Sequence, residues 1–354
     1  MLQAIQQSTG RLTLASQAAR DLTYRCPECG EDLVWRHGPA VVDHFAHHPG
    51  SQCRLGAGES GEHLRGKEQL YHWAQAHAWQ PQLEVYLPEI NQRPDLLVTI
   101  NGQLSAIEFQ CSPLSLSKIM ERNAGYRQLG IPVHWLLGSP YHHRLTRAKC
   151  AQFTQLSHGE PQLLYWDTRA HKLVKRNARR LSYLSHPPAS RSQIAVRQTR
   201  KIQQELNHRN PGLRLLTMAA YRQHHLLAGC PVVAHDWRAA WPVTTRPLLD
   251  WRISCLLWLE QVPLGYSWAK LQWEQCLLSH GQWLQFPCLA DNGRGLIQGV
   301  ISNFTADLVE AGLMKLVAEK VTLCRYPRWF PSAETKIGYL QRRRGGGCWQ
   351  ASNL

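Results

Sequence analysis

The fold is decided by residues 93–110, which read RPDLLVTINGQLSAIEFQ. Two stretches with the composition of β-strands flank Asn101-Gly102, the dipeptide typical of a two-residue type I′ turn. We therefore predict a β-hairpin in which Ile100 pairs with Gln103, and the same register continues outward along both strands.

This register places two acidic residues, Asp95 and Glu108, directly opposite each other. Directly opposed side chains have Cβ atoms about 4.5–5.5 Å apart, and like charges at that distance repel. A cation between them would remove the repulsion, and two carboxylates with water and phosphate suit Mg²⁺. Gln110 shares the face of Glu108, where it could orient a water molecule or a phosphate. The alternative is a solvated polar face of an edge hairpin.

Regular elements are also predicted on both sides of the hairpin. Residues 59–79 lack proline and repeat at helical spacing, and either Glu62 or Glu68 on this helix could join the acidic site. Residues 131–138 read as a buried strand. The order helix, strand, strand, helix, strand indicates a compact α/β unit.

The second predicted helix lies between the hairpin and the last strand. Ser115 or Ser117 can cap it, and it runs to about Leu129. Three polar residues of this helix share one face at i, i+4 and i+8 and could bind phosphates, or could form a solvated face. These candidate DNA-binding residues are Lys118, Arg122 and Tyr126.

A hairpin with P-D followed by E-x-Q resembles the PD-(D/E)-x-K nuclease core. The resemblance implies a restriction-endonuclease-like αβββαβ fold in which Asp95 and Glu108 bind a catalytic Mg²⁺ or Mn²⁺. Glu62 or Glu68 would complete the catalytic group. The usual lysine is replaced by Gln110, and an amide carries no charge and does not readily accept a proton. Catalytic turnover is therefore in question, whereas metal binding is less affected.

A zinc-binding module is predicted ahead of this core. Cys26 and Cys29 form a C-x-x-C knuckle followed by glycine, and histidines and a further cysteine follow at a spacing suited to a structural tetrahedral zinc site. The alternative is a reduced knuckle without metal. The second ligand pair comes from His44, His47, His48 and Cys53, and we favour His47 with Cys53.

The charge is unevenly distributed along the 354 residues, whose net charge is +15. Residues 1–110 carry 8 basic and 12 acidic side chains, whereas residues 111–225 carry 19 and 4. The basic surplus predicts a surface that attracts nucleic acid. No secretory signal or membrane span is recognisable, so we expect a cytoplasmic protein whose eleven cysteines are thiols or metal ligands.

The remainder of the chain gives weaker signals. Residues 141–222 are strongly basic, and Tyr165, Trp166 and Tyr183 among them could stack on unpaired bases or belong to a core. Residues 187–190 read as a linker. The region beyond is expected to be mainly α-helical, with a tryptophan-rich core and helix-like runs at 248–259 and 300–317.

Taken together, the motifs resemble the competence protein CoiA-like family. The resemblance implies a zinc-binding module at 1–57, a PD-(D/E)-x-K nuclease-like domain at 58–186 and a helical domain at 191–354. It also implies a role in natural transformation, either as a nuclease acting on single-stranded or branched DNA or as a non-catalytic DNA-binding adaptor that works with a recombinase. The matching motifs are C-P-x-C at 26–29, H-F-A-H at 44–47, E-S-G-E-H-L-x-x-K at 59–67, R-P-D at 93–95 and I-E-F-Q at 107–110.

Overall fold

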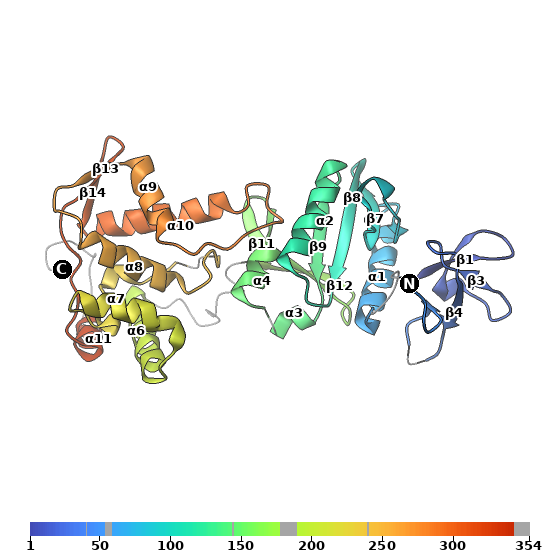
Figure 1. Cartoon of the computed structure of the whole chain (residues 1–354), viewed down its shortest axis with the longest axis horizontal. Helices are drawn as coiled ribbons and strands as arrows, with labels where there is room; N and C mark the ends of the chain where they lie inside the picture. Colours follow the sequence, from blue (N-terminus) through green and yellow to red (C-terminus); the bar gives the residue numbers. More distant parts are fainter. Residues whose placement is uncertain (40, 54–58, 144, 178–189, 239–240, 343–354) are drawn as a thin grey trace. The chain divides into compact units, whose positions relative to one another are not determined.

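The computed structural model describes residues 1–354 except 40, 54–58, 144, 178–189, 239–240 and 343–354 (Figure 1). The chain divides into two compact units, and each is described by itself. The first contains Met1–Asn177 and Pro287–Leu289, and the second contains Ala178–Phe286 and Ala290–Leu354. Most of the predicted linker, residues 187–189, lies outside the described residues.

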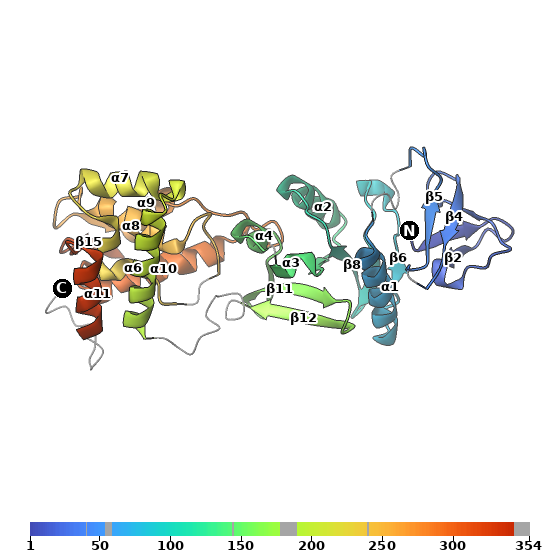
Figure 2. The same ribbon diagram turned by 90° about the horizontal axis from the view of Figure 1, so that it is seen from below.

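The first unit begins with a small antiparallel sheet of five strands in the order β2-β1-β3-β4-β5 (Figure 2). Its core contains Cys26 and the rings of Tyr24 and Phe45, whose centroids lie 4.8 Å apart. The strands are β1 (Gln3–Gln6), β2 (Leu12–Leu14), β3 (Tyr24–Arg25), β4 (Asp32–Arg36) and β5 (His44–His47).

The hairpin predicted from the central stretch is formed by β7 (Leu96–Ile100) and β8 (Gln103–Gln110). Ile100 pairs with Gln103, and the predicted register holds along the hairpin. Both residues of Asn101-Gly102 have a positive φ, as a type I′ turn requires. The prediction of the turn and of the register is confirmed.

The hairpin is part of a mixed sheet in the order β10-β11-β9-β8-β7-β6, with β12 paired to β11. Strand β9 is parallel to both β8 and β11, and the other pairs are antiparallel. The order α1, β6, β7, β8, α2, β9 agrees with the expected αβββαβ order. The remaining elements are α1 (Gly61–Ala76), β6 (Gln82–Leu83), α2 (Leu116–Gln128), β9 (Val133–Leu137), α3 (Pro140–His143), α4 (Arg147–Gln152), β10 (Gln155–Ser157), β11 (Glu160–Asp167) and β12 (Lys172–Asn177).

Serine side chains fix the start of both helices that flank the hairpin. Ser60 Oγ accepts a hydrogen bond from the backbone N–H of His63 at the start of α1. Of the two predicted caps of α2, Ser115 is the one used, since its Oγ accepts from the backbone N–H of Lys118. These caps satisfy backbone donors that have no partner within the helix.

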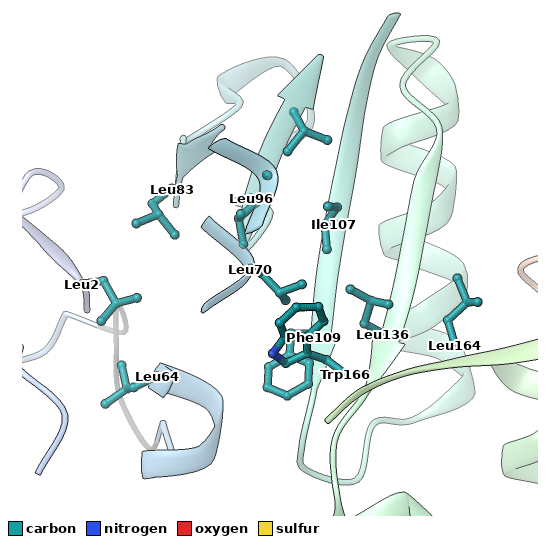
Figure 3. Packing of buried hydrophobic residues seen from close by; sticks show 12 residues of the cluster. Leu2, Leu64, Leu70, Leu83, Leu96, Ile107, Phe109, Leu136, Leu164 and Trp166 are labelled. Atoms are coloured by element: carbon teal, nitrogen blue, oxygen red, sulfur yellow. The ribbon is translucent and has the colours of Figure 1, made fainter. Parts of the chain in front are cut away.

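Helix α1 packs closely on the sheet through the core drawn in Figure 3. Leu64 and Leu70 of α1 belong to one buried cluster with Ile107 and Phe109 of β8. Gly66 lies at this contact, where an added Cβ would stand 2.0 Å from the Phe109 ring. The absence of a side chain at this position therefore allows α1 to lie against β8 and holds the polar residues of α1 near the end of the hairpin.

The second unit is mainly helical, and it also contains a three-stranded antiparallel sheet in the order β13-β15-β14. The predicted helix at 248–259 is confirmed as α8. The helix-like run at 300–317 is only partly helical, because α10 ends at Glu310 and the chain then forms a strand. The elements are α6 (Arg191–Asn207), α7 (Arg214–Arg222), α8 (Leu248–Leu259), β13 (Ser267–Ala269), α9 (Lys270–Ser279), α10 (Arg294–Glu310), β14 (Met314–Val317), β15 (Lys320–Leu323) and α11 (Ala333–Arg342).

Apolar side chains account for the helical packing of this unit. Trp251, Trp268 and Trp273 are buried, as expected for core residues. None of the helices within the described ranges is both long enough and apolar enough to cross a bilayer.

Replacing Gly66 tests the close approach of α1 to β8. Gly66→Ala should lower the free energy of unfolding by about 1–3 kcal/mol, because the new methyl group overlaps the buried Phe109 ring. The matched control is Gly61→Ala in the same helix, where the nearest heavy atom lies 3.9 Å from the added Cβ and stability should not fall. Denaturant unfolding of the two variants makes the comparison, and equal stability would contradict the packing.

Candidate functional site

Four potential zinc ligands meet beside the small sheet: Cys26, Cys29, His47 and Cys53. Their ligand atoms all lie within 4.8 Å of one another. Cys26 Sγ is 4.0 Å from Cys53 Sγ, and Cys29 Sγ is 3.3 Å from His47 Nε2. These are the four residues that the sequence favoured, and three thiolates with one imidazole match a structural zinc site. The cluster could bind a metal ion such as zinc.

Local geometry explains why these side chains converge. Cys26 and Cys29 occupy the turn between β3 and β4, where Gly30 adopts a φ of +74°. His47 ends β5, which is paired with β4. His44, at the other end of β5, has its Nδ1 2.7 Å from the carbonyl oxygen of Val42 and is not part of the cluster.

A second group of potential metal ligands lies at the start of β7, where Glu59, His63 and Asp95 meet within 4.8 Å. His63 Nε2 lies 3.2 Å from Asp95 Oδ2, and His63 Nδ1 lies 3.1 Å from Glu59 Oε1. Asp95 Oδ2 also accepts a hydrogen bond of 2.8 Å from the backbone N–H of Phe109. The imidazole therefore joins two carboxylates, and the strand pairing fixes one of them.

The charges in this group stabilise one another. Burial by itself would lower the pKa of His63, but the hydrogen bond and charge of Asp95, together with Glu59, raise that pKa to about 9. Burial would raise the pKa of Asp95, yet His63 and Lys67 hold it below its usual value. At neutral pH the group therefore contains an imidazolium between two carboxylates.

Lys67 adds a buried positive charge one helical turn beyond His63. Its ammonium is hydrogen-bonded to Glu59 and to Glu84. Burial opposes a charge here, but the carboxylates of Glu84 and Glu59 raise the pKa of Lys67 above its usual value. Glu84 also accepts a hydrogen bond of 3.3 Å from the backbone N–H of Leu2, so this ion-pair network contacts the N-terminal sheet.

Glu108 is buried and has cationic and hydroxyl partners of its own. Arg122 and Tyr126 of α2 both donate to Glu108 Oε1. Burial raises the pKa of Glu108 to about 7, although Arg122 acts in the opposite direction. Arg122 also donates to the carbonyl oxygen of Arg93, next to Pro94 and Asp95. Each carboxylate thus has a cationic partner, His63 for Asp95 and Arg122 for Glu108, although burial still raises the pKa of Glu108.

The other predicted catalytic residues have separate partners. Gln110 donates through Nε2 to the carbonyl oxygen and the hydroxyl of Ser112, at 2.7 and 3.1 Å. Glu62 accepts hydrogen bonds from the backbone N–H and the hydroxyl of Ser139, at 2.7 and 2.8 Å. Glu68 lines a small cavity with residues of the N-terminal sheet, away from the Asp95 group.

The three predicted DNA-binding residues of α2 differ in exposure. Lys118 is exposed and pairs with Glu121 at 2.7 Å. Arg122 and Tyr126 are directed towards Glu108, and the Tyr126 side chain is completely buried. They therefore hold Glu108 in place in this structure, and Lys118 is the member of the three that is open to solvent.

Two aromatic residues considered for base stacking are core residues instead. Tyr165 and Trp166 of β11 are buried, and Trp166 Nε1 donates to Gln69 Oε1 at 2.9 Å. Tyr183 lies outside the residues that the structure describes.

Sequence reasoning missed three residues of the site: Glu59, His63 and Lys67. The signal was present, since the three charged residues follow one another at intervals of four, His63 and Lys67 share a face of α1, and Glu59 directly precedes its cap Ser60. Helical periodicity alone does not show that these charged side chains meet Asp95, because that contact depends on how α1 packs on the hairpin.

Comparisons with known proteins agree with this architecture. Residues 59–209 match the family profile described as the nuclease-like domain of competence protein CoiA, and residues 11–56 match the one described as its N-terminal domain. Competence protein CoiA of Bacillus subtilis (strain 168) is 36% identical over 143 residues, which are 40% of this chain and 37% of that protein. The chain thus matches little more than a third of the length of this curated relative. No solved structure shows a significant match.

Metal analysis of the purified chain tests the cysteine and histidine cluster. We expect about one equivalent of zinc, and we expect Cys26→Ser to lose it and to lower the thermal midpoint by several degrees, because metal binding and folding of the module are coupled. Cys324→Ser, which changes an exposed cysteine outside the cluster, is the control and should keep the metal. A wild-type chain that takes up no zinc would contradict the assignment.

Proposed function

Because the chain belongs to the competence protein CoiA-like family, we propose that it is a metal-dependent nuclease of the PD-(D/E)-x-K class that acts on DNA during natural transformation. A competence-related role follows from the family. The activity on single-stranded or branched DNA, the cytoplasmic location and the recombinase partner are parts of the proposal.

The observation that carries the proposal is the meeting of charged residues at the open end of the β7–β8 hairpin. Asp95 directly precedes β7, and Glu108 of β8 directly follows Ile107, which pairs with Leu96 at the last pair of the hairpin. His63 of α1 and Glu59, which precedes the helix, lie at the same end, within ligand distance of Asp95. The αβββαβ order with P-D and E-x-Q on the hairpin supports the PD-(D/E)-x-K assignment.

The donor set fits a divalent cation. Asp95 and Glu108 would hold the ion, Glu59 offers a further carboxylate, and His63 could join them only after its imidazolium loses a proton. Carboxylates suit Mg²⁺ or Mn²⁺, and an imidazole ligand favours a transition-metal ion such as Mn²⁺. When bound, the ion would supply a polarised water and charge stabilisation at the phosphate.

The side chains of this chain would then position the reacting groups. Arg122 and Tyr126 hold the Glu108 carboxylate in one orientation, and the Phe109 amide does the same for Asp95. We assign to Gln110 the orientation of water or phosphate. Glu62, held by Ser139, is assigned a supporting role beside the site.

The alternative is a non-catalytic DNA-binding adaptor that helps to load a recombinase, and one observation favours it. The lysine position of the PD-(D/E)-x-K pattern is occupied by Gln110, whose amide donates to Ser112. The buried Lys67 is already shared by two carboxylates. Neither group offers a free ammonium to an attacking water.

Cleavage assays separate the two functions. With Mg²⁺ or Mn²⁺ the wild-type chain should cut single-stranded or branched DNA, and Asp95→Asn or Glu108→Gln should lower the rate at least about 100-fold, since metal charge stabilisation contributes several kcal/mol. The control is Glu121→Gln, which changes an exposed acid of α2 and should leave the rate unchanged. Absence of metal-dependent cleavage by the wild type, with transformation intact in the two site variants, would support the adaptor.

A further inference from the structure

Helix α7 in the second unit exposes large apolar side chains to solvent. Leu215 is 81% exposed, Tyr221 is 75% exposed and Met218 is 43% exposed. Arg214 and Arg222 are exposed at the two ends of the same helix. The spacings of three and four residues place all five on one face, which we call the α7 face. Figure 2 draws α7 at the edge of the helical unit.

The sequence around α7 is basic. The thirty residues from Leu206 to His235 include three arginines and no aspartate or glutamate. Helix α6, which precedes α7, exposes Arg197, Arg200 and Lys201, and Lys201 lies 3.9 Å from the Glu205 carboxylate. An apolar surface in a positive environment is complementary to a ligand that combines negative charge with apolar faces.

An open hollow of about 490 Å³ adjoins the α7 face. Leu215 and Ala219 of α7 line one side, and the opposite side includes Arg246, His280 and Gln282. Thr245 Oγ1 lies 3.1 Å from Gln282 Oε1, and Arg246 pairs with Asp250 at 2.7 Å. Polar and apolar residues line the hollow in similar proportion, with Asp250 among the polar ones, and its volume is of the size that binds small planar ligands.

We propose that the α7 face and the adjoining hollow bind single-stranded nucleic acid. Arg214 and Arg222 contact phosphates, Tyr221 stacks on a base, and the hollow accepts a neighbouring base. A duplex hides the base faces that the apolar side chains would contact. The choice of nucleic acid over an acidic protein rests on the proposed DNA-directed function, and the experiment distinguishes the two.

Fluorescence anisotropy with a labelled oligothymidylate of about 20 nucleotides, on the full chain without added divalent metal, tests the stacking contact. Tyr221→Ala should weaken binding about tenfold, because base stacking on one aromatic contributes roughly 1–3 kcal/mol. The matched control is Tyr266→Ala, whose side chain is 51% exposed in the same unit and does not line the hollow. Circular dichroism and thermal midpoints verify that both variants are folded.

A charge-reversal pair tests the phosphate contacts. Arg214→Glu with Arg222→Glu should weaken binding at least tenfold and reduce the slope of log Kd against log salt by about 1.4, the value for two phosphates of a single strand. Arg294→Glu with Lys315→Glu makes the same change in net charge at exposed positions outside the α7 face and should have a much smaller effect.

Two outcomes would overturn this inference. The first is wild-type affinity in folded α7 variants. The second is that an abasic oligonucleotide or polyglutamate displaces the labelled oligothymidylate as well as the unlabelled oligothymidylate does. That result would show that the α7 face recognises negative charge alone, as expected for an acidic protein partner. The proposed nuclease function is tested separately. Asp95→Asn should bind the oligonucleotide as the wild type does, because Asp95 is not part of the α7 face. If the wild type binds the oligonucleotide but shows no metal-dependent cleavage, the nuclease function is rejected and the binding inference is retained.

Discussion

Asp95 and Glu108 are largely buried at the end of the β7–β8 hairpin, and each is paired with a cation. The packing of the first unit depends on these pairs. Strand pairing sets Asp95 against Glu108, and neither carboxylate could remain ionised there alone. Helix α1 supplies His63 to Asp95, and α2 supplies Arg122 to Glu108. The two helices are therefore held to the sheet by electrostatic contacts as well as by apolar packing, and Gly66 allows the first of them to come close enough.

The same network contacts the N-terminal sheet. Glu84 binds Lys67 and the backbone of Leu2, while Arg93 donates to the carbonyl oxygen of Glu84 and pairs at 2.9 Å with Glu28. Glu28 lies between the two cysteines of the knuckle. The N-terminal segment that carries the four potential zinc ligands and the nuclease-like core are thus joined by ion pairs next to the acidic site.

The two units differ in the burial and the pairing of the charged side chains that could contact a nucleic acid. In the first, the carboxylates are buried, paired and close to potential metal ligands, and Arg122 and Tyr126 are occupied with holding Glu108. In the second, the α7 face is exposed and carries Arg214 and Arg222 at its two ends. The net charge of +15 is consequently a sum over an acidic front with internal ion pairs and a basic region that faces solvent.

Several features of this structure depend on interactions between neighbouring residues and could therefore be predicted from the sequence. Asn101-Gly102 defined a turn and hence a register, Ser115 capped a helix, and the C-x-x-C knuckle with its downstream histidines and cysteine indicated the four residues that converge. Tertiary structure alone decided which charges meet: Glu59 and His63 reach Asp95 from more than thirty residues away, and Arg122 and Tyr126 turn inward to Glu108. The reason is that turns and caps depend on neighbouring residues, whereas burial and ion pairing depend on which elements pack together.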